Sequence, residues 1–250
     1  MQFVIFIIIG FAAQLIDGTL GMAYGVSCRT FLKMAGLPAS MASAVVHCSE
    51  VPTTLVSGIA HWRFKNVSWK LLLKLAIPGV IGGVLGAWVL SSIGDKLEPF
   101  IDVYLIVMGV LIFVKVFKKG DKAPRREGAY VYPLGFIGGF LDATGGGGWG
   151  PVVTSTMLAS NHDTKKTIGT VNTAEFVVTL AQTTAFLVLI SDFIAHWQTI
   201  LGLIIGGVLA APLAAWICKK LPVKPLLAIV GTLIVGLNIY NLVTWIIAAL

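Results

Sequence analysis

The sequence predicts an all-α polytopic membrane protein, made of two homologous repeats with four membrane segments each. Three observations indicate this fold class. The 250 residues are 57% hydrophobic and 12% charged, with a mean hydropathy of +0.91, so the charged side chains could not cover the surface of a soluble domain. Long apolar stretches follow one another along the chain, and residues 125 positions apart match repeatedly.

The apolar stretches, in chain order, are 2–36, 39–62, 71–93, 99–117, 130–160, 167–191, 197–218 and 225–250. A helix needs about 20 residues to cross the hydrocarbon core, so the first and fifth stretches are too long for one crossing. The first stretch lacks the basic start of a cleavable signal. We therefore expect a first membrane repeat over 1–119, a cytoplasmic linker over 120–129 and a second membrane repeat over 130–250.

An internal alignment without gaps places Gly10–Trp62 against Gly135–Leu187. Biased composition inflates chance identity, but it does not explain matched acidic residues in a chain with so few of them. The matched pairs include Gly10/Gly135, Asp17/Asp142, Thr19/Thr144, Gly21/Gly146, Gly25/Gly150, Glu50/Glu175 and, after a shift of three residues, Gly79/Gly207. This periodicity indicates a duplication.

The distribution of Lys and Arg predicts that the repeats are inverted. If the first and fifth stretches each enter and return, as a re-entrant loop or a short hairpin, 15 positive residues fall on one side and three on the other. The positive-inside rule assigns the richer side to the cytoplasm and both termini to the outside. Inverted repeats with broken helices are typical of transporters, which bind substrate near the midplane.

Each repeat carries a glycine motif within its long first stretch. A run of glycines disfavours a continuous helix, and a new helix beginning there presents free N–H groups that attract an anion. The candidate substrate-binding residues are Asp17, Gly18, Thr19, Gly21, Tyr24, Gly25, Ser27, Arg29, Asp142, Thr144, Gly145, Gly146, Gly147, Gly148, Trp149, Gly150, Thr154 and Asn172.

Simpler interpretations of these residues stay open. The glycines would also allow close helix packing, and the carboxyls of Asp17 and Asp142 would cap free N–H groups at a helix break. Arg29 has no basic counterpart at Thr154. It would bind an anion directly or, as the preferred interpretation, anchor at the membrane interface by snorkelling.

Glu50 and Glu175 lie inside apolar stretches, where an ionised side chain is unfavourable unless it is paired or hydrated. Burial favours the protonated carboxyl. The two glutamates are therefore candidate proton carriers, together with His47, which has the register of Asn172 and precedes Glu50 by three residues. A hydrogen-bonding role in helix packing is the alternative for His47.

Other classes of protein lack their signatures. The basic residues lie in short loops and form no nucleic-acid face, and three scattered cysteines indicate neither a disulfide framework nor a metal site. Without a GxxxxGK[ST] loop, ATP is not the driver within this chain. An intramembrane aspartyl enzyme using Asp17 and Asp142 is a weak alternative, because the Gly-x-Gly-Asp signature is absent. We expect no catalytic residue, no cofactor and no metal.

Four segments together resemble the TauE/SafE sulfite exporter family: GFAAQLIDGTLGMAYGVS, HCSEVPTTLVSGIAHWRFKNV, GFLDATGGGGWGPVVTSTML and TIGTVNTAEF. The resemblance implies transport of a small sulfur oxyanion or organosulfonate across an inner membrane. We expect a secondary transporter with alternating access and proton coupling. A passive anion channel of the same architecture is the alternative, and a homodimer is left open.

Overall fold

The computed structural model describes residues 2–22, 24–114, 128–160 and 162–217, together with 228, 232, 235, 236, 238–240 and 242–247 in the last apolar stretch. All regular elements in this part of the chain are helical. Most of the predicted linker at 120–129 lies outside the described residues, and so does much of the eighth apolar stretch.

The first half of the chain begins with α1 (Gln2–Leu20) and α2 (Tyr24–Met34), which divide the first long apolar stretch between them. They are followed by α3 (Ala39–Arg63) and α4 (Trp69–Val114). Helix α4 is kinked at Ile93, where φ is −137° and ψ is 17°. Its two limbs correspond to the third and fourth predicted segments.

The second half begins with α5 (Val131–Gly145), a π-helical turn η1 (Gly150–Thr154) and the short α6 (Ser155–Ala159), which together cover the fifth apolar stretch. Next come α7 (Thr164–Leu189), the 3-10 helix η2 (Ser191–His196) and α8 (Trp197–Ile217). Asp163 caps α7 by accepting a hydrogen bond from the N–H of Lys166, which satisfies one of the free donors at a helix start.

The outer surface of the bundle is apolar. Within the described part of the chain, four helical segments are long and apolar enough to cross a bilayer: Phe3–Leu20, Trp69–Gly94, Thr164–Leu189 and Ser191–Ile217. Ile8, Ile77 and Leu209 are more than 60% exposed. Side chains of this kind on a helical bundle face lipid, because a helix satisfies its own backbone groups there. The chain is a multi-pass, all-α membrane protein.

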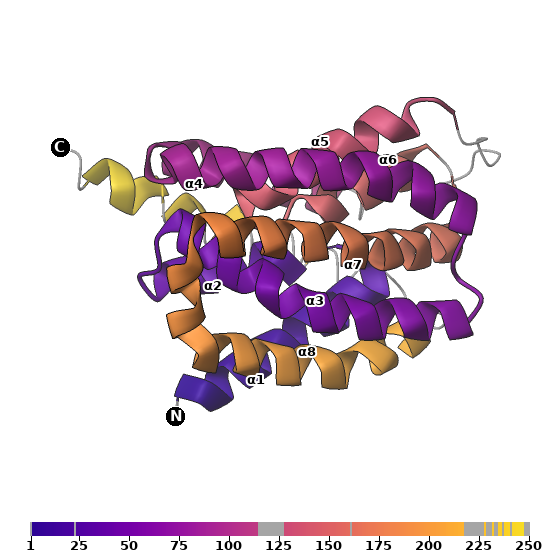
Figure 1. Ribbon diagram of the computed structural model, residues 1–250, viewed down its shortest axis with the longest axis horizontal. Helices are drawn as coiled ribbons and strands as arrows, with labels where there is room; N and C mark the ends of the chain where they lie inside the picture. The colour runs from indigo at the N-terminus through magenta and orange to yellow at the C-terminus, as the bar shows by residue number, and fades with distance from the viewer. Residues whose placement is uncertain are drawn as a thin grey trace.

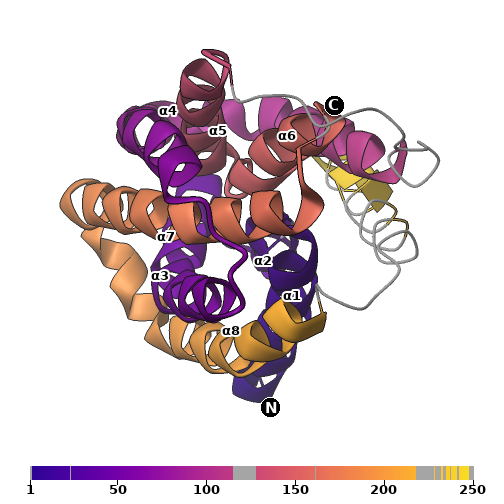
Figure 2. The ribbon, with the colours of Figure 1, turned by 90° about the vertical axis from the view of Figure 1, so that its right-hand side faces the viewer.

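The long helices lie side by side and form one packed series, α5–α4–α7–α3–α8–α1. The end-on view in Figure 2 shows α3 and α7 in the middle, with α4 and α5 on one side and α1 and α8 on the other. The first helix of each half therefore packs against a helix from the other half (Figure 1).

Glycine makes both of these cross-half contacts possible. A Cβ added at Gly10 would collide with the backbone of Leu203 in α8, and one added at Gly135 would collide with the backbone of Leu75 in α4. Gly10 and Gly135 are a matched pair in the internal alignment. Thus α1 of the first half packs on α8 of the second, and α5 of the second half packs on α4 of the first. The direction in which each half crosses the membrane stays a prediction.

Candidate functional site

Two helix breaks face each other in the middle of the bundle. Helix α1 ends at Leu20 and α2 begins at Tyr24, with Gly21 between them at φ +70°. Helix α5 ends at Gly145, and Gly146 and Gly147 follow at φ +65° and +153°. Side chains other than glycine rarely adopt these angles, so glycine is needed at the positions where the helices stop.

An aspartate caps each break. Oδ1 of Asp17 accepts a hydrogen bond from the N–H of Tyr24 at 3.5 Å, and Oδ1 of Asp142 accepts one from the N–H of Trp149 at 2.9 Å. Both bonds span seven residues. These contacts support the capping interpretation of the two aspartates. Asp142 is held further by Gln182 of α7, whose side-chain amide donates to Oδ2 at 3.0 Å.

The two breaks are in direct contact. A Cβ added at Gly25 would lie 2.6 Å from Cα of Gly147, and one added at Gly150 would meet the backbone of Met22. Gly25 and Gly150 are matched positions, and so are Met22 and Gly147. The two contacts are therefore equivalent, with the roles of the two halves exchanged. The same added atom at Gly25 would lie 3.2 Å from Oε1 of Glu50. The contact between the breaks thus borders directly on one of the predicted proton carriers.

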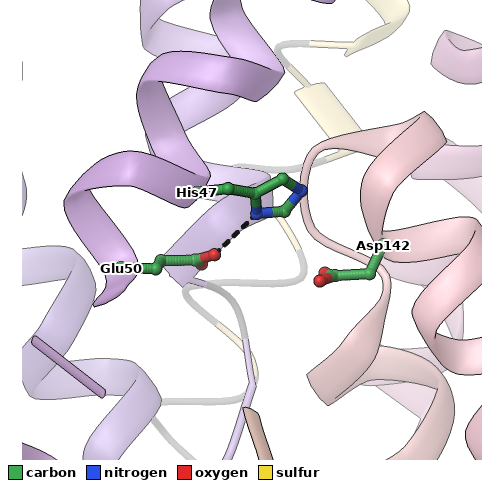
Figure 3. A group of neighbouring side chains, drawn as sticks. All are labelled: His47, Glu50 and Asp142. Carbon is green, nitrogen blue, oxygen red and sulfur yellow. Dashed lines mark hydrogen bonds and ion pairs between the residues drawn. The ribbon is translucent and has the colours of Figure 1, made fainter. Parts of the chain in front are cut away.

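An imidazole and two carboxyls meet beside the second break. Nδ1 of His47 lies 2.9 Å from Oε2 of Glu50, one turn along α3. The carboxyl of Asp142 points toward the same space from α5 (Figure 3). One potential ligand atom from each residue lies within 4.8 Å of the others, and none of the three residues is more than 1% exposed.

The acids matched to Glu50 and Asp142, which are Glu175 and Asp17, belong to the same buried centre. Glu175 of α7 interacts electrostatically with Asp17, Glu50 and Asp142. Oε2 of Glu175 and Oδ2 of Asp17 are buried and have no hydrogen-bond partner within the described part of the chain. Four carboxyl groups, contributed by α1, α3, α5 and α7, therefore share one interior region.

Arg29 of α2 lies against the second break. It is 1% exposed, and its side chain occupies the space that a Cβ of Gly146 would need. The interfacial snorkelling interpretation is therefore wrong, because a snorkelling residue keeps its charged end in water. In the matched position of the other repeat, the hydroxyl of Thr154 donates to the carbonyl oxygen of Gly21.

Tyr104, on the second limb of α4, completes the surroundings of the second break. A Cβ added at Gly148 would lie 2.6 Å from the Tyr104 hydroxyl oxygen, and one added at Gly145 would lie 2.9 Å from the ring. The hydroxyl has no hydrogen-bond partner among the described residues. Tyr104 was not predicted as a site residue, because it belongs to neither repeated motif.

Several predicted substrate-binding residues have partners inside the protein. The hydroxyls of Thr19 and Thr144 donate to carbonyls of their own helices, and Asn172 accepts a hydrogen bond from the hydroxyl of Ser57 at 3.0 Å. Tyr24 donates to the carbonyl of Leu203, and the indole of Trp149 to that of Val171.

The remaining predicted residues divide between the breaks and their edges. Gly18 lies against Ala214 of α8, while Ser27 is half-buried on α2. The second break is surrounded by Arg29, Tyr104, His47, Glu50 and Asp142. The first break is lined by Asp17, Gly21 and Thr154. Gln182 is not among the predicted site residues, although its hydrogen bond to Asp142 joins α7 to this centre.

A buried polar centre at two helix breaks, inside a bundle with an apolar outer face, is typical of membrane transport proteins. Comparison with known proteins agrees. The family described as Sulfite exporter TauE/SafE matches residues 6–241, and the chain belongs to this family. A relative from Bacillus subtilis (strain 168), named Probable membrane transporter protein YtnM, is 39% identical over 256 residues, which cover 98% of this chain and 84% of that protein.

No solved structure matches the chain. The family and the relative's name both point to a membrane transporter and not to an enzyme.

Proposed function

We propose that the protein is a secondary transporter of a small sulfur-containing anion, sulfite or an organosulfonate, which works by alternating access and is coupled to protons. The observation that carries this proposal is the convergence of four buried carboxyls, His47 and Arg29 where the two helix breaks meet. The family's description as a sulfite exporter supports the substrate class.

The second break is the better candidate for the anion. Among the residues whose burial is described, Arg29 is the Lys or Arg whose side chain is buried. A guanidinium can donate two parallel hydrogen bonds to a pair of oxygens of one oxyanion. The Tyr104 hydroxyl adds a donor on the same glycine segment. The amides of Tyr24 and Trp149 already donate to the aspartates, so side chains rather than these two amides would hold the anion.

The glutamates are the better candidates for protons. An isolated ionised carboxylate is unfavourable in a low-dielectric interior, and several within one region are more so. Protonation of Glu50 or Glu175 would relieve this cost, and His47 would exchange a proton with Glu50 through their 2.9 Å contact. Loading and release of protons would then accompany the rearrangement of the breaks.

The proposed topology rests on the distribution of Lys and Arg. Two inverted repeats, 1–119 and 130–250, joined by a cytoplasmic linker at 120–129, would place both termini outside an inner membrane. The exchange of helix partners between halves supports this plan. Reporter fusions at residue 120 and at the C-terminus test it: we expect residue 120 inside and the C-terminus outside, and a cytoplasmic reporter at both sites would exclude the plan.

The coupling is tested in proteoliposomes loaded with radiolabelled sulfite, with and without a pH gradient. We expect Glu50→Gln to abolish the response to the gradient while binding of sulfite stays measurable, because the amide cannot release a proton. Asp192→Asn, which changes an exposed acid in η2, is the control and should respond as the wild type does. An undiminished response in Glu50→Gln would remove the proton role.

The same vesicles separate a carrier from a channel. A carrier saturates with sulfite and exchanges external for internal substrate, whereas a channel conducts without either property. Conductance that is independent of the pH gradient would favour the passive channel.

A further inference from the structure

We propose that Lys33 is a second binding residue for the transported anion, one helical turn beyond Arg29 on α2. The carboxylate of Asp102 holds the Lys33 ammonium group until the anion takes its place. This role rests on the proposed function and adds to it a step between the second break and the end of α2.

Lys33 and Asp102 form an ion pair between α2 and the second limb of α4. Nζ of Lys33 lies 2.6 Å from Oδ2 of Asp102, and the two side chains are 14% and 1% exposed. Oδ1 of Asp102 is buried and has no hydrogen-bond partner within the described part of the chain. Charged side chains inside membrane segments are costly, and they typically mark the pathway of an ion or a substrate. The pair is therefore a candidate part of the anion's route.

The ion pair stands between the buried site and the end of α2. Arg29 and Lys33 are four residues apart in this helix, so they share a face and lie about 6 Å apart along its axis. Exposure rises along α2 from 1% at Arg29 to 50% at Met34. Asp102 precedes Tyr104 by two residues on the same limb of α4. The two segments that bring Arg29 and Tyr104 to the second break thus place Lys33 and Asp102 on the side of the exposed end of α2.

The second half has apolar residues at the positions of the ion pair. In the internal alignment Lys33 matches Leu158 and, in the register shifted by three residues, Asp102 matches Val230. Replacing a buried ion pair by apolar residues is often neutral or stabilising, so stability alone is a weak reason for the pair. The second half also has a threonine in the place of Arg29. Arg29, Lys33 and Asp102 thus occur together in one half, as expected for parts of one pathway.

A sulfur oxyanion is chemically equipped to replace Asp102 as the partner of Lys33. Carboxylates and sulfur oxyanions both accept hydrogen bonds from an ammonium group through charged oxygens. Lysine carries a point charge on a flexible stem of four carbons, so the Lys33 ammonium can turn from Asp102 to an anion that leaves Arg29. When the anion departs toward the end of α2, Asp102 takes up the ammonium again. The exchange of partners thus moves the anion one turn outward.

The test measures sulfite affinity by calorimetry on the purified full chain in detergent, and sulfite counter-exchange in proteoliposomes. Asp102→Asn removes the competitor for the ammonium, so we expect sulfite to bind about fivefold more tightly, on the scale of coupling between charges in one network. Lys33→Gln leaves the Asp102 carboxylate unpaired near the anion, so we expect weaker binding. Loss of a merely structural ion pair would change the affinity in the same direction in both variants.

The double variant Lys33→Gln/Asp102→Asn separates a transport role from a structural one. It leaves neither residue as an unpaired charge, so it should fold even if a single variant does not. We expect at least about tenfold slower exchange, the effect of losing one charge-assisted contact, while sulfite still binds at Arg29. Lys96→Gln, which changes an exposed lysine near the kink of α4, is the matched control and should exchange sulfite as the wild type does.

The outcomes distinguish this step from the proposed function. Exchange at the wild-type rate by the double variant, or unchanged or weaker sulfite binding by folded Asp102→Asn, would overturn the role of Lys33 alone. A wild type that neither binds nor exchanges sulfite would refute the proposed function, and this step with it.

Discussion

The two helix breaks share a register but differ in the side chains beside them. At the first break, the Thr154 hydroxyl bonds to the carbonyl of Gly21, so a neutral residue closes the turn. At the second break, Arg29 occupies the corresponding position and Tyr104 lies over the glycines. The two breaks therefore share a capping aspartate, while the guanidinium and the tyrosine hydroxyl lie at the second break alone among the described residues.

The largest expected effect comes from making the second break resemble the first. Arg29→Thr introduces the residue found at position 154 and removes the buried guanidinium. We expect sulfite binding to weaken at least about tenfold, in line with the loss of a charge-assisted hydrogen bond of roughly 1.5–3 kcal/mol. Calorimetric titration with sulfite checks this, with Thr154→Ser as the control. Unchanged affinity in Arg29→Thr would place the anion elsewhere.

The aspartates should differ in what they contribute to stability. Asp142 accepts hydrogen bonds at 2.9 and 3.0 Å, whereas Asp17 accepts one at 3.5 Å. Asp142→Ala should therefore lower the free energy of unfolding by about 2 kcal/mol, and Asp17→Ala by about half of that. Thermal unfolding of both variants in detergent provides the comparison. A larger loss in Asp17→Ala would contradict the ranking of the two caps.

The smallest effect is expected at Thr154. Thr154→Val keeps the shape of the side chain but removes the hydroxyl that bonds to Gly21. We expect a loss of about 1 kcal/mol in the free energy of unfolding, the net value of one buried hydrogen bond, and no change in sulfite affinity. The same unfolding and titration measurements serve here. A drop in affinity as large as that of Arg29→Thr would show that both breaks hold substrate.

Much of the architecture was accessible from the sequence because the bilayer imposes simple rules. Apolar length indicated the membrane helices, and the positions of Gly21 and Gly146 indicated where the first and fifth stretches are interrupted. The acids were found because an ionisable side chain in an apolar stretch is expensive. These inferences depend on local composition, which the order of the residues shows directly.

The site's partners were less accessible because they depend on which helices meet. Tyr104 lies outside the repeated motifs and reaches the glycines only through the path of α4 after its kink at Ile93. The meeting of Asp142 with His47 and Glu50 joins residues from opposite halves. Arg29 was assigned to the interface because the end of an apolar stretch does not reveal whether a neighbouring helix covers it.

The glycine contact between α1 and α8 bears on the order in which the protein is made. Helix α1 is synthesised first, but its partner ends at Ile217. At roughly 5–20 residues per second, α1 would wait on the order of 10–40 s in the bilayer before α8 could pack against it. Helix α5, in contrast, meets an α4 that has already left the ribosome. Helix α1 is thus fixed against its partner only after α8 has been made, and the length of the chain between them sets the time during which a chaperone or a protease could act on the unpaired helix.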